Sequence, residues 1–136
     1  MFEEKNLADR TGKAAVPPAR ILVIDDSRSV RELLLLHLRS AGYDVLGAED
    51  AVEAGKLIVE RPPDLLIVDI NMPYMSGIEF VAALRADPEV SGIPVIFLSS
   101  REDVAQEARR LGPVACLTKP AAADRLLEIV ALHLPR

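Results

Sequence analysis

Three aspartates stand at the ends of two apolar runs in this chain of 136 residues. The run 21–24 leads into Asp25 and Asp26, and the run 65–68 leads into Asp69. Short apolar runs of this kind are typical of strands that are buried on both faces of a sheet. The carboxyl ends of parallel strands meet at one edge of an open α/β sheet, where ligand sites form. We therefore expect the three carboxylates to lie close together.

Two further apolar runs also end in polar groups, because 93–98 precedes Ser99 and 114–118 precedes Lys119. Clustered carboxylates repel one another, and a divalent cation with oxygen ligands such as Mg²⁺ removes that cost. A lysine supplies a positive point charge that suits phosphate. The set indicates Mg²⁺-assisted phosphoryl transfer onto a carboxylate, with an aspartate as the nucleophile.

Each of these residues also has an ordinary structural interpretation. Asp26 or Ser27 can cap the helix that follows, Ser99 can cap a later helix, and Lys119 can be a solvated surface lysine. The convergence of several polar strand ends favours a functional role for all of them. Cys116 is expected to be a small buried hydrophobe rather than a redox group.

The apolar periodicity predicts five strand–helix pairs in sequence. Strands are expected at 20–24, 43–48, 64–69, 93–98 and 114–118, and helices at 27–40, 50–60, 77–86, 102–111 and 122–134. Short links between such units give right-handed crossovers and a parallel sheet. The predicted fold is an α/β, flavodoxin-like (βα)5 doubly wound parallel sheet with strand order 2-1-3-4-5, whose switch point lies between strands one and three.

The motifs resemble those of the receiver domains of two-component response regulators. The resemblance covers about residues 20–134, and the spacings of 43 residues from Asp26 to Asp69 and 30 from Asp69 to Ser99 fit the family. The residues that carry it are Asp25-Asp26, Asp69 with Met72-Pro73 and Gly77, Ser99, and Lys119-Pro120.

The resemblance implies that Asp69 is phosphorylated, to 4-aspartylphosphate, by the phosphohistidine of a histidine kinase or histidine phosphotransfer protein. Ser99 and Lys119 would bind the phosphoryl oxygens and take part in the catalysis. The implied ligands of Mg²⁺, with Mn²⁺ as an alternative ion, are Asp25, Asp26, Asp69 and the backbone carbonyl of Asn71. The peptide bond between Lys119 and Pro120 is usually cis in the family.

Such a domain phosphorylates and dephosphorylates itself and turns over no external substrate, so it is not expected to be an enzyme in the usual sense. The surface formed by the fourth helix, the fifth strand and the fifth helix of the predicted fold (102–111, 114–118 and 122–134) would control a downstream protein that the sequence does not identify.

The chain departs from the family in two places. At Cys116 an aromatic residue is common in the family, and the segment between Ser99 and Gly112 is about two residues shorter than usual. We therefore expect the structural change on phosphorylation to occur mainly in residues 99–111. A monomer or a phosphorylation-linked dimer is implied.

Composition limits the partners and the cellular compartment that we expect for this domain. The net charge of −5 makes nucleic acid an unfavourable direct partner, and a single cysteine fits a reducing compartment. No apolar run is long enough to span a membrane, and the acidic N-terminus does not fit a signal peptide, so a cytoplasmic location is expected. Residues 1–19 are predicted to be a disordered tail, and residues 20–136 to be the receiver domain.

Two other functions compete with phosphorylation-dependent signalling. One is a receiver-like protein-binding module that is never phosphorylated. The other is a Mg²⁺-dependent hydrolase of the haloacid dehalogenase kind, which needs a second aspartate two residues after the nucleophile, where this chain has Asn71. The sequence leaves open whether the domain acts alone or within a longer chain.

Overall fold

The computed structural model describes residues 17–100 and 105–134. Five parallel strands form one sheet in the order β2-β1-β3-β4-β5, which confirms the predicted flavodoxin-like topology. The strands are β1 (Arg20–Ile24), β2 (Asp44–Ala48), β3 (Leu65–Asp69), β4 (Val95–Ser99) and β5 (Ala115–Thr118). The switch point falls between β1 and β3, as predicted.

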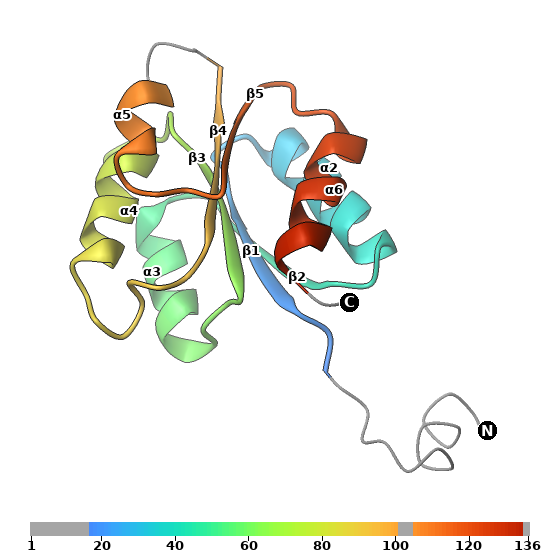
Figure 1. Ribbon diagram of the computed structural model, residues 1–136, viewed down its shortest axis with the longest axis horizontal. Helices are drawn as coiled ribbons and strands as arrows, with labels where there is room; N and C mark the ends of the chain where they lie inside the picture. Colours follow the sequence, from blue (N-terminus) through green and yellow to red (C-terminus); the bar gives the residue numbers. More distant parts are fainter. Residues whose placement is uncertain (1–16, 101–104, 135–136) are drawn as a thin grey trace.

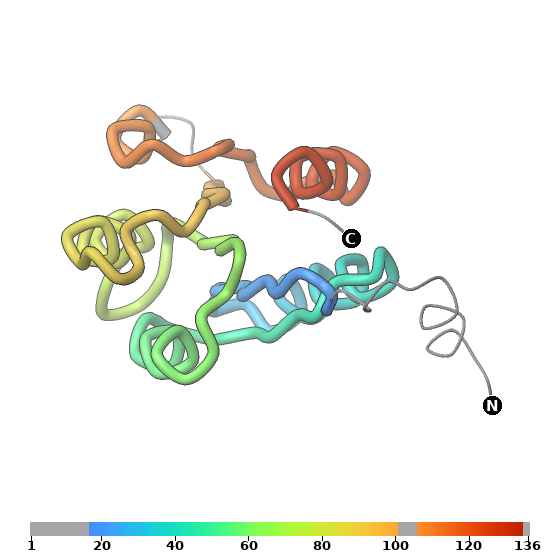
Figure 2. The backbone as a smooth tube through the Cα atoms, turned by 60° about the horizontal axis from the view of Figure 1, so that its bottom comes forward, coloured from blue at the N-terminus to red at the C-terminus, as the bar shows by residue number. Residues whose placement is uncertain are grey.

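Helices cover both faces of the sheet. They are α2 (Arg28–Ser40), α3 (Ala51–Glu60), α4 (Gly77–Arg85), α5 (Ala105–Arg109) and α6 (Ala123–His133). Figure 1 shows α2 and α6 on one face and α3, α4 and α5 on the other, and Figure 2 shows the same two groups from a second direction. None of the helices in the described ranges is both long and apolar enough to cross a membrane.

Every residue of β3 is buried, and alternate residues serve the two faces of the sheet. Leu65 and Ile67 belong to the core beneath α2 and α6, while Leu66 and Val68 belong to the core beneath α3, α4 and α5. A strand with apolar side chains on both faces needs a helical layer on each side. The continuous apolar run that ends in Asp69 is therefore explained by its central place in the sheet.

Helices α2 and α3 bury fewer residues against the sheet than their apolar patterns suggest. Leu33 keeps the helical spacing of the apolar residues of α2, but it is 55% exposed, and the buried positions are Leu34 and Leu38. Val52 is an apolar residue of α3 and is exposed as well. A helix packed on a sheet buries a stripe of residues that lie three or four apart, so apolar residues beside that stripe stay exposed.

Most element boundaries agree with prediction within two residues. At β4 the strand begins at Val95 rather than residue 93, because Ile93 donates its backbone N–H to Val90 in a turn and Pro94 has no N–H to donate. Helix α5 spans Ala105–Arg109, and residues 101–104 of its predicted range lie outside the described residues. Ala19, predicted as part of the tail, is buried and accepts a backbone hydrogen bond from Asp44, whereas residues 1–16 lie outside the described part.

Tyr74 adopts a left-handed backbone conformation with φ of 69°, and its side chain is 99% exposed. A residue with a Cβ pays about 1–2 kcal/mol for this conformation, and glycine does not. An exposed ring offers no packing to offset that cost. We expect Tyr74→Gly to stabilise the protein by about 0.5–1 kcal/mol once the greater freedom of glycine in the unfolded chain is included.

Thermal unfolding measures this effect as a rise in the melting temperature (Tm) of a few degrees. Gly55→Ala on α3 is a matched comparison, since a Cβ at Gly55 meets nothing within 4 Å and alanine also favours the helix. A lower Tm for Tyr74→Gly would show that the ring makes a stabilising contact.

Candidate functional site

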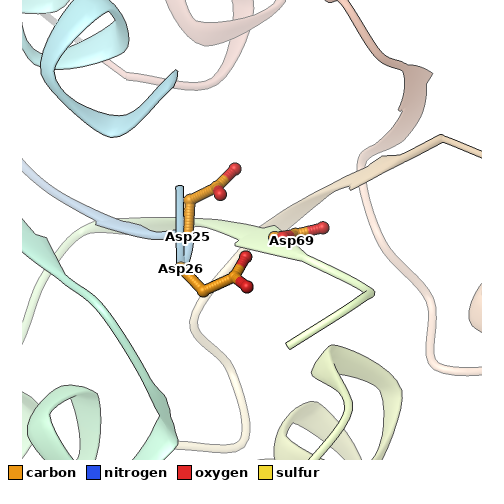
Figure 3. Close-up of side chains that lie close together, drawn as sticks. All are labelled: Asp25, Asp26 and Asp69. Atoms are coloured by element: carbon orange, nitrogen blue, oxygen red, sulfur yellow. The ribbon is translucent and has the colours of Figure 1, made fainter. Parts of the chain in front are cut away.

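Three carboxylates meet at the carboxyl edge of the sheet. Asp25 and Asp26 directly follow β1, and the pairing of Ile24 with Val68 places Asp69 at the same level on β3. One carboxylate oxygen from each of the three lies within 4.8 Å of the others. Figure 3 shows all three side chains directed into the same space beyond the strand ends. Asp25 and Asp69 are buried, whereas Asp26 is exposed.

The helix that follows β1 begins with a cap from Ser27, whose Oγ accepts a hydrogen bond from Val30 N at 3.4 Å. Asp26 is therefore not the N-cap of α2, and this interpretation of the residue does not hold. Its carboxylate stays at the edge of the sheet beside Asp25 and Asp69.

Backbone amides fix the orientation of the two buried carboxylates. Ser27 N donates to Asp25 Oδ1 at 2.9 Å, and Asn71 N donates to Asp69 Oδ1 at 3.0 Å. The second oxygen of each carboxylate faces Lys119, whose Nζ lies 2.9 Å from Asp25 Oδ2 and 3.1 Å from Asp69 Oδ2. One ammonium thus bridges two carboxylates on neighbouring strands.

Lys119 is placed by the end of β5 and is not a freely solvated surface residue. Its side chain is only 20% exposed, its backbone N donates to Ser99 O at 2.7 Å, and the peptide bond to Pro120 is cis, as expected. Burial acts to lower the pKa of Lys119, but the carboxylates of Asp25 and Asp69 outweigh it and the net shift is upward. The side chain is therefore an ammonium at neutral pH.

Burial, and next the charge of Asp25, raise the pKa of the Asp69 carboxyl to about 6. Lys119 and the N–H of Asn71 oppose this shift without cancelling it. A carboxylate is destabilised in such a setting, and an added cation lowers its pKa again. The charged form of Asp69 is thus the form that a divalent ion would favour.

Ser99 is buried and is the last residue of β4, one position beyond the residue that pairs with Asp69. The strand end therefore brings Ser99 to the same sheet edge as the carboxylates. Asn71 adds a link between loops, because its side-chain amide nitrogen donates to Ser100 Oγ at 3.1 Å. The sequence did not predict that link, since nothing in the pattern distinguishes Ser100 from its neighbour.

Gly77 opens α4 directly above the end of β3, where its N–H donates to Ile70 O at 2.8 Å. A Cβ at this position would collide with the backbone carbonyl oxygen of Asp69 and lie 2.9 Å from Val68 Cγ1. Only glycine allows α4 to pack this closely against the strand that carries Asp69.

Comparison with known proteins agrees with this geometry. The family model of the response regulator receiver domain matches residues 21–131. The chain belongs to this family. The receiver domain is 39% identical over 112 residues to the response regulator MprA of Mycobacterium sp. (strain KMS), a match that covers 81% of this chain and 48% of the relative. This chain therefore spans about half the length of that relative.

Shorter relatives match over nearly their whole length. Protein PilG of Pseudomonas aeruginosa is 33% identical over 118 residues, which is 85% of this chain and 87% of PilG. Among solved structures, the chemotaxis protein CheY4 of Vibrio cholerae superimposes with a TM-score of 0.79 at 34% identity, covering 86% of this chain and 99% of the CheY4 chain. Receiver domains are signalling domains of two-component systems, so the comparisons support that class of function here.

The acidic cluster fits a hard divalent cation. It offers three carboxylates within ligand distance of one another, and Asp25 Oδ2 is buried without a hydrogen bond of standard geometry despite the nearby ammonium of Lys119. Mg²⁺ uses few carboxylates and keeps several waters, and the exposure of Asp26 leaves one side of the cluster open to solvent.

Mg²⁺ is expected to raise the Tm of the receiver domain by binding the folded state, with a gain of about 2.7 kcal/mol at 100 times the dissociation constant. Asp26→Asn should weaken this response, while relief of like-charge repulsion slightly raises the Tm of the metal-free protein. Glu60→Gln, an exposed carboxylate at the end of α3, is the control and should respond like the native protein. A Tm that does not change across millimolar Mg²⁺ would contradict the site.

Proposed function

We propose that this receiver domain accepts a phosphoryl group on Asp69 from the phosphohistidine of a histidine kinase or histidine phosphotransfer protein. The observation that carries the proposal is the position of Asp69, whose carboxylate ends the central strand between two further carboxylates and one ammonium. Mg²⁺ would be held by Asp25, Asp26, Asp69 and the backbone carbonyl of Asn71. Bound there, it supplies charge neutralisation for the carboxylates and the incoming phosphoryl oxygens.

In the transfer, a lone pair of the Asp69 carboxylate forms the new O–P bond and the P–N bond of the donor breaks. The imidazole nitrogen of the donor keeps the electron pair of the broken bond. Asn71 N–H holds one carboxylate oxygen of Asp69 in a fixed orientation during this step. Lys119 then has a phosphoryl oxygen as a partner in place of the charge that Asp69 has lost, and Ser99 would bind a second phosphoryl oxygen.

Phosphorylation would act on a partner through the surface formed by α5, β5 and α6. Lys119 supports this idea, because it joins Asp69 to the end of β5 and the start of the segment that leads into α6. A changed contact at its ammonium is a differential interaction of the kind that can shift the population of two packings. The downstream protein and the oligomeric state belong to this proposal too, as a monomer or a phosphorylation-linked dimer.

Native protein incubated with acetyl phosphate tests the proposal by intact-mass measurement. One added phosphoryl group is expected with Mg²⁺, and none after the metal is chelated. Protein that stays unmodified in both conditions would favour a receiver-like binding module. Asn71 stands where the dehalogenase-type hydrolases need an aspartate, so no observation favours that alternative.

A groove of about 340 Å³ borders the site and suits the approach of a protein donor. It includes Lys119 and is otherwise apolar, and its lining residues are Val30, Leu33, Leu34, Leu98, Lys119, Pro120 and Ala121. The donor must bring its phosphorus atom to Asp69, which Lys119 contacts directly. We therefore propose that the donor's histidine-bearing segment packs an apolar face into this groove.

Leu33→Asp should slow transfer from a phosphorylated kinase or phosphotransfer protein by about tenfold or more, because it places a charge in an apolar contact. Labelling by acetyl phosphate should stay unchanged, since a small donor needs no groove. Val59→Asp on α3 is the matched control, because Val59 is 83% exposed and does not line the groove. Equal transfer rates for Leu33→Asp and Val59→Asp would place the docking surface elsewhere.

A further inference from the structure

Arg31 on α2 contacts the backbone of the acidic site. Its Nη1 donates to the backbone carbonyl oxygen of Asp25 at 2.7 Å, and its side chain is half-buried. That carbonyl belongs to the peptide unit that joins Asp25 to Asp26, so the hydrogen bond restrains the orientation of the peptide between two carboxylates of the cluster. A charged donor makes this a stronger contact than a neutral hydrogen bond.

The path of the Arg31 side chain depends on Gly47 of β2. A Cβ at Gly47 would lie 3.0 Å from Arg31 Cδ, 3.1 Å from Arg31 Cγ and 3.2 Å from Leu35 Cδ1. Gly47 pairs with Val23 on β1, so the arginine stem lies against β2 next to the strand that leads into the acidic pair. The bare backbone of Gly47 thus provides the space through which a residue of α2 reaches the end of β1.

Asp25 is held by several other bonds as well. Its backbone N donates to Ala48 O at 3.0 Å, and its Oδ1 accepts from Ser27 N at 2.9 Å. Arg31 adds a restraint on the carbonyl side, which is the side that continues into Asp26. Asp26 is exposed and has little packing of its own, so the direction of its carboxylate depends on the backbone that precedes it.

We propose that Arg31 is a positioning residue for the metal site, which it serves by holding the Asp25–Asp26 peptide so that both carboxylates face Asp69. This role rests on the proposed Mg²⁺-dependent function. Gly47 shares in it by leaving room for the arginine stem. Neither residue touches the ion or the phosphoryl group.

The charge of Arg31 and its proposed positioning role lead to opposite expectations for the Mg²⁺ affinity of a variant that lacks the guanidinium. A cation near a Mg²⁺ site repels the ion, so its removal strengthens binding if charge alone matters. Loss of a positioning contact weakens metal binding, and for residues that orient ligands the loss is typically 10–100-fold. The sign of the change in Mg²⁺ affinity therefore separates the two effects.

The experiment measures the Mg²⁺ dissociation constant by calorimetry, together with Tm and the amide exchange rate of Ser27 in the metal-free protein. Arg31→Met should weaken Mg²⁺ binding about tenfold and speed exchange at Ser27, whose N–H bonds to Asp25. Arg31→Lys keeps a donor and should recover part of the affinity, and Gly47→Ala should shift affinity in the same direction as Arg31→Met. Arg28→Met is the matched control, because Arg28 is an exposed cation on the same helix that pairs with Glu32.

Unchanged or tighter Mg²⁺ binding by Arg31→Met would overturn the positioning role, even with a lower Tm. Weakened binding by Arg28→Met to the same extent would overturn it too, because a general effect on α2 would then explain both variants. If the native protein binds no Mg²⁺, the proposed function itself fails, and the role of Arg31 fails with it. Native binding with an unaffected Arg31→Met variant refutes the role of Arg31 alone.

Discussion

Asp69→Asn is expected to abolish phosphorylation of this receiver domain. The neutral amide of asparagine is a much weaker nucleophile than a carboxylate and does not form the O–P bond, while the size of the side chain and its hydrogen bond from Asn71 N–H can be retained. Incubation with acetyl phosphate and Mg²⁺ should add no phosphoryl mass to the variant. Asp124→Asn, an exposed position on α6, should be labelled like the native protein.

The same substitution has a pH-dependent effect on stability. The pKa of Asp69 is about 6 in the folded protein and about 3.9 in an unfolded chain, so between these values the folded state binds more protons. The contribution of Asp69 to the stability of the native protein therefore falls as the pH rises from about 4 to about 6, and the loss is complete above that window. Asparagine carries no charge and avoids it, so Asp69→Asn should be more stable by about 2 kcal/mol at pH 7 without metal.

Urea unfolding in the presence of a chelator measures this difference at two pH values. The advantage of Asp69→Asn over the native protein should be clear at pH 7 and should shrink toward pH 4, where Asp69 of the native protein is protonated in the folded state and about half protonated in the unfolded chain. A variant that is less stable at pH 7, or an advantage that does not change with pH, would refute the raised pKa as the cause.

Lys119→Met is expected to destabilise the metal-free protein strongly. The ammonium neutralises Asp25 and Asp69, which are both buried, and removing one partner of a buried ion pair typically costs about 3–5 kcal/mol. Protonation of Asp69 relieves part of this cost, so we expect about 3 kcal/mol at pH 7. Methionine keeps an unbranched side chain of similar length, so the loss reports the charge rather than the packing.

Mg²⁺ should recover more stability in Lys119→Met than in the native protein, because the ion then replaces the charge that the ammonium supplied to Asp25 and Asp69. Lys56→Met on α3 is the control, since Lys56 is exposed and its removal should change stability by less than about 0.5 kcal/mol. Equal urea midpoints for Lys119→Met and the native protein in chelator would mean that the ammonium is not needed to balance the two carboxylates. The variant should also accept a phosphoryl group without the change in partner binding that follows in the native protein.

The sheet and the cluster were predictable because strand ends are visible in the sequence. The run before Asp69 is continuously apolar, and a parallel sheet with helices on both faces demands that pattern. Its carboxyl end must then meet the carboxyl ends of the neighbouring strands. The close approach of Asp25, Asp26 and Asp69 follows from these two facts and the strand order alone.

Side-chain detail was less accessible. Leu33 fits the spacing of the buried stripe on α2, yet the sheet leaves it exposed beside Lys119, where it lines the groove. The contact of Arg31 with Asp25 depends on the path of a long side chain past Gly47, and an arginine in a helix carries no sign of its target. The raised pKa of Asp69 depends on its degree of burial, which is known only once the layers are assembled.

Identification of the modified residue tests the central claim most directly. Native protein is phosphorylated with acetyl phosphate and Mg²⁺, the acyl phosphate is reduced with borohydride, and the peptides are sequenced by mass spectrometry. The proposal predicts a single reduced residue, Asp69, which is absent when Mg²⁺ is chelated. A label on another residue, or the same label on Asp69 without Mg²⁺, would contradict it.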